Sequence, residues 1–341
     1  MSEATLPIDE VICADAIEGL ATLPADCGTL AIVDGPYNMR KAAWDKFASW
    51  DEFREFYRPL WAALGEALRD NCSLYVFGTF ESLAALKPDL DGLGGGWRFV
   101  NHIVLHREAV YLKKFAPEKF RSWLPGHYED CLFYARERVD ISALAWDGVT
   151  RDDNSIRAYL NTERERAGLS VADIHKAWYE KYQTYGCGAG HWFGQSQWRF
   201  PPRRDYLWLR DLFNERGPVN DEYLRREYED LRREYEDLRY TFNPEKGVTD
   251  VWNVPICAGA ERVKANGETA HVAQKPLEIM RRIVRASSNE GDLVLVPFSG
   301  VGSAEVACKE LGRRFIGFDI SEEYCAMARR RIGNAQGAMA L

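Results

Sequence analysis

The sequence lacks the features that define several classes of protein. Its eight cysteines are scattered singly over 341 residues with no CxxC pair, which argues against a disulfide framework and a zinc knuckle. No apolar run approaches the ~20 residues that span a bilayer, and the N-terminus lacks a basic signal peptide. We therefore expect a soluble, cytoplasmic protein. The formal net charge of -8 does not indicate a nucleic-acid binder, but it leaves room for a local basic groove.

What is present is the composition of a globular protein, with 46% apolar and 28% charged residues. Apolar runs that are typical of strands alternate with amphipathic stretches that are typical of helices at both ends of the chain. This alternation predicts βαβ units and a largely parallel sheet. The expected strands are 30–37, 73–80, 97–106, 129–136, 291–298 and 313–320, and the expected helices are 49–68, 276–288, 303–312 and 321–332.

The middle of the chain shows helical patterns, in contrast to the alternating strands and helices at its two ends. Four helical pieces are expected there, at 154–168, 170–182, 190–198 and 201–213. A seven-residue repeat, REYEDLR, follows twice in tandem at 226–239 and places a narrow apolar stripe on a charged helix. Because two heptads are too few for a coiled coil, we expect a solvated helix that packs against its own domain.

A glycine-containing loop, Phe298-Ser299-Gly300-Val301-Gly302, joins an expected strand to an expected helix. Glycines at this place let the backbone approach a ligand at the helix N-terminus. Asp319 ends the next strand, at the spacing where a Rossmann-type site binds ribose hydroxyls. The pattern predicts a nucleoside-binding site, and the alternatives are a tight structural turn and a surface aspartate.

Asp34-Gly35-Pro36-Tyr37 forms a second constellation at the end of a strand. A carboxylate and a backbone carbonyl can accept hydrogen bonds from an amino group, while an exposed aromatic ring stacks on a flat base. The alternative is an ordinary Asp-Gly turn.

Together these segments resemble the amino-specific DNA methyltransferases, which modify adenine N6 or cytosine N4. Residues 34–38 are similar to the family's D-P-P-Y-N, and residues 298–302 to its F-x-G-x-G, in the class where the catalytic motif comes first. Residues 271–276 are similar to H-P-T-Q-K-P, and 314–319 to R-[FY]-I-G-[IF]-[ED]. Ala14-Asp15 stands where the family has a glycine and an aspartate. The resemblance covers residues 1–138 and 245–335.

The resemblance implies a Rossmann-like, doubly wound, mostly parallel α/β sheet with a helical insertion. Residues 1–148 would form the catalytic half, 149–244 the insertion and 245–341 the donor-binding half. The cofactor would be S-adenosyl-L-methionine. The implied catalytic residues are Asp34, Gly35, Pro36 and Tyr37, and the implied cofactor-binding residues are Asp15, Lys275, Phe298, Ser299, Gly300, Gly302 and Asp319.

The implied activity is site-specific methylation of a base that has left the DNA stack, with adenine N6 favoured over cytosine N4. Two residues depart from the family pattern. Gly35 replaces a proline, and Val296 replaces an acid near the methionine end of the donor. These departures leave open a modified donor that adds a different group, or a DNA-binding protein with a decayed donor site.

The insertion resembles a helix-turn-helix domain, with residues 190–198 in the place of the recognition helix. Gln195, Gln197 and Arg199 are then the candidate contacts to double-stranded DNA. The alternative is a lid of helices that packs on the catalytic domain through its tryptophans. No metal is expected, because His102 and His106 lie four apart on an expected strand, too far apart for one ion. A homodimer and a cognate restriction endonuclease are left open as further partners.

Overall fold

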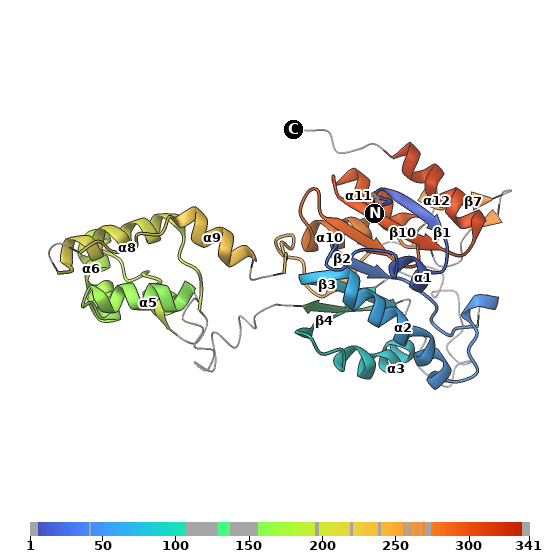
Figure 1. The fold of residues 1–341 in the computed structure, drawn as a ribbon, viewed down its shortest axis with the longest axis horizontal. Coiled ribbons are helices and arrows are strands. Elements are labelled where there is room, and N and C mark those ends of the chain that lie inside the picture. Colours follow the sequence, from blue (N-terminus) through green and yellow to red (C-terminus); the bar gives the residue numbers. More distant parts are fainter. Residues whose placement is uncertain are drawn as a thin grey trace, which may run out of the picture. The chain divides into compact units, whose positions relative to one another are not determined.

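The computed structural model describes residues 6–40, 42–106, 128–136, 156–194, 198–218, 221–237, 240–254, 257, 261–265, 268–269 and 274–335. The chain divides into two compact units (Figure 1). The first unit comprises Met1–Arg136 together with Tyr240–Leu341, and the second is Glu137–Arg239. Each unit has a hydrophobic core of its own.

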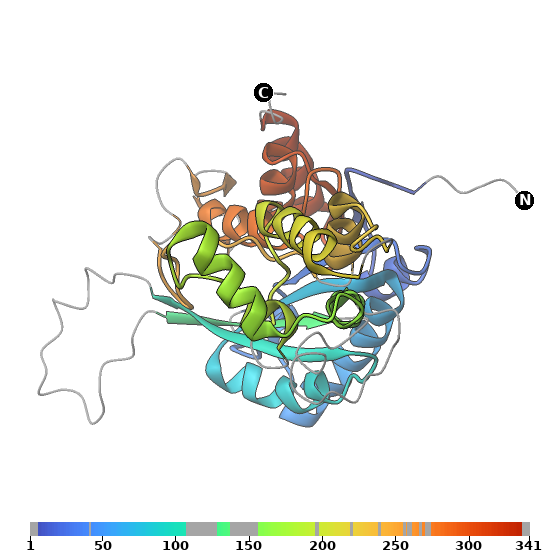
Figure 2. The ribbon, with the colours of Figure 1, turned by 90° about the vertical axis from the view of Figure 1, so that its left-hand side faces the viewer.

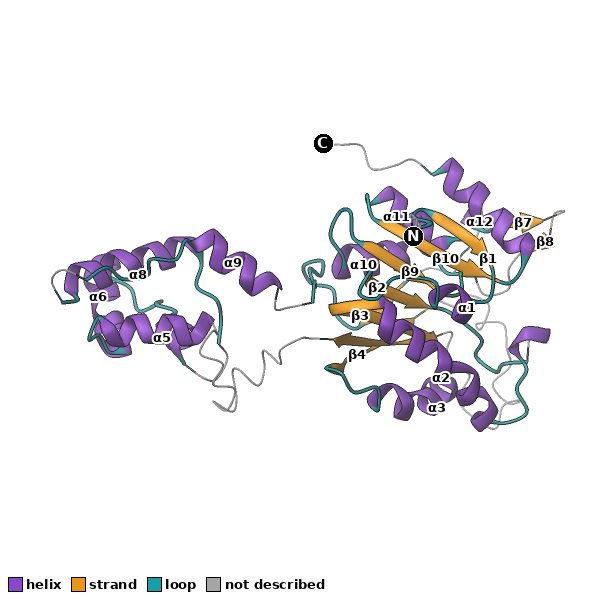
Figure 3. Ribbon diagram, viewed as in Figure 1, coloured by secondary structure: helices purple, strands orange, loops and turns teal. Residues whose placement is uncertain are grey.

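An eight-stranded sheet in the order β1-β10-β9-β2-β3-β5-β4-β6 forms the first unit (Figure 3). Its strands are β1 (Glu10–Cys13), β2 (Gly28–Val33), β3 (Leu68–Gly78), β4 (Trp97–His106), β5 (Tyr128–Arg136), β6 (Val251–Asn253), β9 (Leu293–Val296) and β10 (Arg314–Asp319). Of these strands, β5 runs antiparallel to both of its neighbours, whereas the remaining pairings are parallel. A two-stranded ribbon is separate from this sheet and consists of β7 (Lys264–Ala265) and β8 (Glu268–Thr269).

Helices cover both faces of this sheet, as expected for a doubly wound fold. One core joins the sheet to α1 (Ala16–Leu20), α2 (Trp50–Ala67) and α3 (Phe80–Asp91). The opposite core joins it to α10 (Leu277–Ser287), α11 (Ser303–Glu310) and α12 (Glu322–Asn334). The buried strand β2 contributes to both, because Leu30 and Ile32 lie in one core and Ala31 and Val33 in the other.

The described part of the second unit contains five helices. They are coloured from green to yellow in Figure 2. They are α5 (Ile156–Arg166), α6 (Val171–Tyr182), α7 (Ala189–Phe193), α8 (Arg203–Arg216) and α9 (Tyr228–Asp237). Trp178 lies at the centre of an aromatic group and contacts the rings of Trp192 and Trp208 edge-on. These tryptophans are therefore buried in the core of their own unit. The repeat helix α9 also joins this core, through Tyr228 and Leu231.

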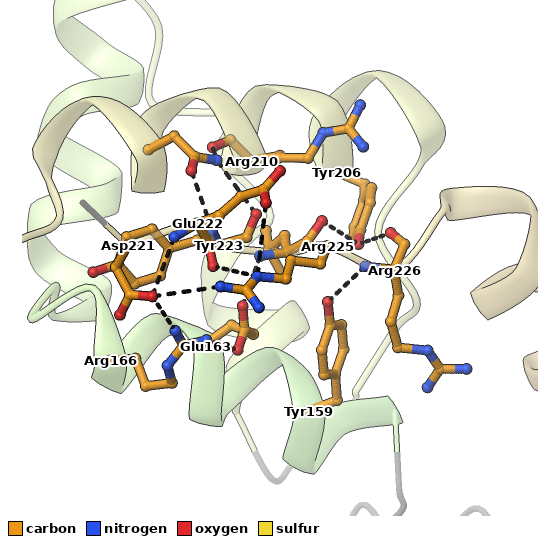
Figure 4. Close-up of polar contacts among 12 residues, drawn as sticks. Tyr159, Glu163, Arg166, Tyr206, Arg210, Asp221, Glu222, Tyr223, Arg225 and Arg226 are labelled. Atoms are coloured by element: carbon orange, nitrogen blue, oxygen red, sulfur yellow. Dashed lines mark hydrogen bonds and ion pairs between the residues drawn. The ribbon is translucent and has the colours of Figure 1, made fainter. Parts of the chain in front are cut away.

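A polar network ties the segment that precedes α9 to α5 and α8 (Figure 4). Glu163, which is buried in α5, accepts a hydrogen bond from the backbone of Leu224 and pairs with Arg166. The hydroxyl of Tyr159 accepts a hydrogen bond from the backbone of Arg226. Buried polar groups that are satisfied in this way favour a single arrangement of the segment.

The sequence predicted most of these elements within a few residues. The expected helix at 190–198 is an exception, because α7 ends at Phe193 after five residues. Its side chains at Trp192 and Phe193 are buried, so this short helix is anchored in the core. Gln195 and Gln197 lie outside the described residues. Among the described helices, none is long and apolar enough to cross a membrane.

Candidate active site

A cavity of about 1000 Å³ opens at the carboxyl edge of the parallel strands. Strands β1, β2, β9 and β10 all lead into this edge, so segments that are distant in the sequence line one space. Most of the predicted catalytic and cofactor-binding residues line it. They are Asp15, Asp34, Gly35, Pro36, Tyr37, Lys275, Phe298, Ser299, Gly300 and Asp319.

The turn after β2 is held in place by a residue that the sequence did not point to. The buried carboxylate of Asp45, which ends the short helix η1 (Ala43–Asp45), accepts backbone hydrogen bonds from three successive residues of this turn. The donors are Tyr37 and Asn38, at 2.7 and 2.6 Å, and Met39, at 2.9 Å. Asn38 has a φ of 60°, a left-handed conformation that an asparagine tolerates. The turn is therefore preorganised by this carboxylate.

Four side chains meet on the wall of the cavity. The hydroxyl of Tyr37 donates toward Asp34 Oδ1 at 2.6 Å and toward Glu129 Oε1 at 2.7 Å. Lys275 Nζ lies 2.6 Å from the same oxygen of Asp34 and 2.7 Å from the same oxygen of Glu129. It is also 3.0 Å from the Tyr37 hydroxyl. The side chain of Tyr37 is half-buried and its hydroxyl is held by hydrogen bonds, whereas the sequence suggested an exposed aromatic.

The charges of this cluster follow from its burial. Burial by itself would lower the pKa of the Lys275 ammonium, but the carboxylates of Asp34 and Glu129 reverse this effect and raise it. Burial and the same two carboxylates raise the pKa of the Tyr37 hydroxyl well above its ordinary value. At neutral pH the site therefore holds a lysine cation and a neutral tyrosine.

Glu129 escaped the sequence interpretation because of the direction of its strand. We expected a strand at 129–136 within a largely parallel sheet, but the sequence did not assign its direction. β5 is antiparallel to β3, and its register pairs Asp130 with Gly78 at the carboxyl end of β3. The beginning of β5 therefore lies at the edge where the cavity opens. A single-sequence pattern does not reveal the direction of a strand.

Gly35 proves to be a close-packed position. A Cβ atom at this residue would lie 2.5 Å from the hydroxyl oxygen of Tyr57 and 2.7 Å from the ring of Phe298. The Tyr57 hydroxyl donates a hydrogen bond to the carbonyl of Pro36 at 2.8 Å. The absence of a side chain at Gly35 thus lets the turn after β2 pack directly against the glycine-containing loop.

That loop has the geometry expected of a nucleoside-binding turn. Gly300 and Gly302 have φ angles of 52° and 77°, and a Cβ atom at Gly302 would lie 2.9 Å from the Cβ of Ala328. Asp319 holds the loop, because one carboxylate oxygen accepts from the Gly300 backbone at 2.9 Å. Its other oxygen accepts from the backbone of Ser321 at 2.9 Å. Asp15 makes similar backbone contacts, because its carboxylate caps α1.

Two residues next to this loop, Val296 and Glu305, are buried. Val296, only 2% exposed, is part of the hydrophobic core and lines the cavity. Behind the loop, Glu305 of α11 is fully buried, and burial raises the pKa of its carboxyl to about 7. Its carboxylate and the hydroxyl of Ser299 converge on the space above Gly317, which a side chain there would fill. Nothing in the sequence singled out Glu305 beyond its place in an amphipathic helix.

Two of the remaining candidates, Arg199 and His102, make contacts within their own units. Arg199 of the helical unit donates its backbone N–H to the carbonyl of His191. His102 is hydrogen-bonded to Asp130, 2.6 Å away. Across the described part of the chain, no group of three or more histidine, cysteine, aspartate or glutamate residues is arranged to bind a metal ion.

Comparison of the chain with known proteins identifies its family. A family model described as DNA methylase, of the N6/N4 type, matches residues 29–330. The chain therefore belongs to the N6/N4 DNA methylase family, which confirms the predicted resemblance.

Two bacterial relatives match a shorter part of the chain. The type II methyltransferase M.HinfI of Haemophilus influenzae is 37% identical over 91 residues, which are 26% of this chain and 25% of that protein. The type II methyltransferase M2.DpnII of Streptococcus pneumoniae is 41% identical over 90 residues, which are 26% of this chain and 32% of that protein. The matches thus span a third or less of the length of these relatives.

Solved structures share the fold over nearly the whole chain. TTHA0409 of Thermus thermophilus, described as a DNA modification methylase, has a TM-score of 0.50 and 16% identity, covering 96% of this chain and 94% of that one. The cytosine-N4-specific PvuII DNA methyltransferase also has a TM-score of 0.50, with 10% identity, and covers 94% of this chain and 85% of that one. These likenesses confirm the expected fold class.

Proposed function

We propose that this protein transfers a methyl group from S-adenosyl-L-methionine to the exocyclic amino group of a base in double-stranded DNA, with adenine N6 as the target. One observation carries the proposal. The turn that bears Asp34 and the loop that bears Gly300 face a single cavity and pack against each other through Gly35 and Phe298. Family membership supports the same reaction.

The residues present fit the cofactor. Gly300 and Gly302 adopt backbone conformations that favour glycine, and Gly300 lines the cavity whereas Gly302 does not. The carboxylate of Asp319 lines the cavity and is an acceptor group, which is what hydrogen bonds from ribose hydroxyls require. Asp15, Lys275, Phe298 and Ser299 would complete the binding site. When bound, S-adenosylmethionine supplies a methyl group that is activated by its sulfonium centre.

The residues of the catalytic turn would bind the base and orient its amino nitrogen. An exocyclic amine is a poor nucleophile because its lone pair is delocalised into the ring. Asp34 and the backbone carbonyl of Gly35 would accept the amino hydrogens, which directs the lone pair toward the methyl group. The ring of Tyr37 would stack on the base, and its fixed hydroxyl limits the freedom of that ring. Most of the acceleration would come from this preorganised positioning.

The activity can be tested even though the DNA sequence that the protein recognises is not known. Unmethylated genomic DNA is incubated with the protein and S-adenosylmethionine, and the nucleosides are then analysed by mass spectrometry. We expect N6-methyladenine to form with the wild type and not with Asp34→Ala. Formation of N4-methylcytosine would contradict the choice of adenine, and the absence of both products would contradict the activity.

We also propose that the helical insertion, residues 149–244, recognises the DNA sequence. In support of this, α5–α9 form a compact unit whose tryptophans pack against one another, as a separate reading module requires. Gln195, Gln197 and Arg199 remain the candidate contacts to bases and phosphates. The double variant Gln195→Ala with Gln197→Ala should lose methylation of the preferred site and keep donor binding measured by calorimetry. Equal loss of both would contradict this role.

A further inference from the structure

The catalytic cluster holds more carboxylates than binding an amino group requires. Asp34 and Glu129 both line the cavity, and their side chains are only 16% and 11% exposed. Lys275 provides one positive charge for these two carboxylates. The hydroxyl of Tyr37 joins these two carboxylates by hydrogen bonds, so a proton that reaches one of them has a path to the other.

We propose that Glu129 receives the proton that the amino nitrogen loses on methylation, through Asp34 and the hydroxyl of Tyr37. The inference rests on the proposed function and extends it to the fate of that proton. Asp34 Oδ1, Tyr37 Oη and Glu129 Oε1 form a continuous chain, with steps of 2.6 and 2.7 Å. These distances are those of hydrogen bonds to ionised oxygens.

The hydroxyl of Tyr37 makes the relay chemically simple. It carries one proton but lies within hydrogen-bonding distance of two carboxylate oxygens, so it can donate to either of them. When Asp34 takes a proton from the base, the Tyr37 oxygen accepts it and passes its own proton to Glu129. The tyrosine ends as neutral as it began. Because its pKa is held well above the ordinary value, the phenolate is not formed at rest.

The overall step balances. The amino nitrogen forms a bond to the methyl carbon, the bond from that carbon to sulfur breaks, and the electron pair stays on sulfur. The nitrogen then loses one proton, which ends on Glu129 and reaches solvent after the product leaves. Lys275 keeps its proton throughout, because both carboxylates favour its charged form.

The test measures single-turnover rates with saturating donor and DNA. Proton transfer by a positioned side chain contributes about 10²–10⁴-fold, so we expect Glu129→Gln to slow methylation by about 10²-fold. Glu129→Asp should recover part of that loss, and added formate should raise the rate of Glu129→Ala. Tyr37→Phe, which keeps the ring and deletes the relay oxygen, should show a similar loss. Donor binding, measured by calorimetry, should stay within a few-fold of the wild type.

Glu310→Gln is the matched control, because Glu310 is also ion-paired, with Arg281, but does not line the cavity. It should leave the rate unchanged. An active wild type with Glu129→Gln or Tyr37→Phe within about threefold of its rate would overturn the relay and leave the proposed methylation standing. A loss that neither Glu129→Asp nor formate restores would also overturn it, since that is the result of a structural role. An inactive wild type would instead contradict the proposed function itself.

Discussion

Lys275 donates a hydrogen bond to Asp34 over 2.6 Å, although the two residues are 241 positions apart in the sequence. The contact joins the segment before α10 to the turn after β2. Because Lys275 is only 3% exposed, its charge depends on this carboxylate and on that of Glu129. The ion pair therefore holds the N-terminal and C-terminal parts of the chain together at the wall of the cavity.

Replacement of Lys275 should lower the free energy of unfolding. Lys275→Met leaves two carboxylates facing each other in a buried place, and breaking a buried pair typically costs about 3–5 kcal/mol. Urea unfolding should show a loss of this order. Lys87→Met is the control, since Lys87 pairs with Asp91 on the surface and such pairs contribute about 0–1 kcal/mol. Equal effects of the two substitutions would show that the buried pair contributes no more than a surface one.

Asp34→Ala should abolish methyl transfer and keep binding of donor and DNA within a few-fold of the wild type. An interaction that matters most in the transition state affects the rate more than the affinity, and one such partner is worth about 10²–10³ in rate. Asp34→Asn should fail as well, because an amide supplies no negative charge. Lys275 retains Glu129 as a partner in both variants, so the fold should persist. Single-turnover rates within about tenfold of the wild type would contradict the catalytic role.

Gly35→Ala tests the close packing of the turn after β2. The added Cβ would lie 2.5 Å from Tyr57 Oη and 2.7 Å from the Phe298 ring, so one of them must move. Overpacking of this kind costs about 1–3 kcal/mol, and displacement of Phe298 should also weaken donor binding. Gly65→Ala in α2 is the control, because nothing lies within 4 Å of its Cβ. That substitution should stabilise the helix by about 0.5–1 kcal/mol. Unchanged unfolding of Gly35→Ala would show that the turn can adjust.

Glu305 should make the stability of the protein depend on pH. Burial raises the pKa of its carboxyl from 4.5 to about 7, so the folded state binds this proton more tightly than the unfolded state does. The contribution of this group to the free energy of unfolding is complete below about pH 4.5 and is lost as the pH rises to about 7. Because one pKa unit corresponds to about 1.36 kcal/mol, the loss amounts to about 3 kcal/mol. Glu305→Gln should therefore stabilise the protein at pH 8 and have little effect at pH 4.5.

Urea unfolding at the two pH values measures this effect. Glu310→Gln serves as its control, because Glu310 is paired with Arg281 and partly exposed. The prediction is contradicted when Glu305→Gln gives no larger gain at pH 8 than at pH 4.5.

The sequence by itself determined the class of fold and the family. Alternating apolar and amphipathic stretches are local patterns, and they located β2, β9 and β10 together with α2, α10 and α11. The segments around Asp34, Gly300 and Asp319 could be recognised because each consists of neighbouring residues. The heptad stripe of Tyr228 and Leu231 likewise predicted a helix packed against its own unit.

Only the tertiary structure decided the composition of the site. Glu129 belongs to it because β5 runs against its neighbours, and the direction of a strand depends on pairing partners that are distant in the sequence. Asp45 belongs to it because the chain folds back to bring a carboxylate under the turn. The close packing at Gly35 likewise depends on Phe298, a residue far along the chain. Such contacts leave no local signal, because the two residues of each contact are not neighbours in the sequence. Only the fold brings them together.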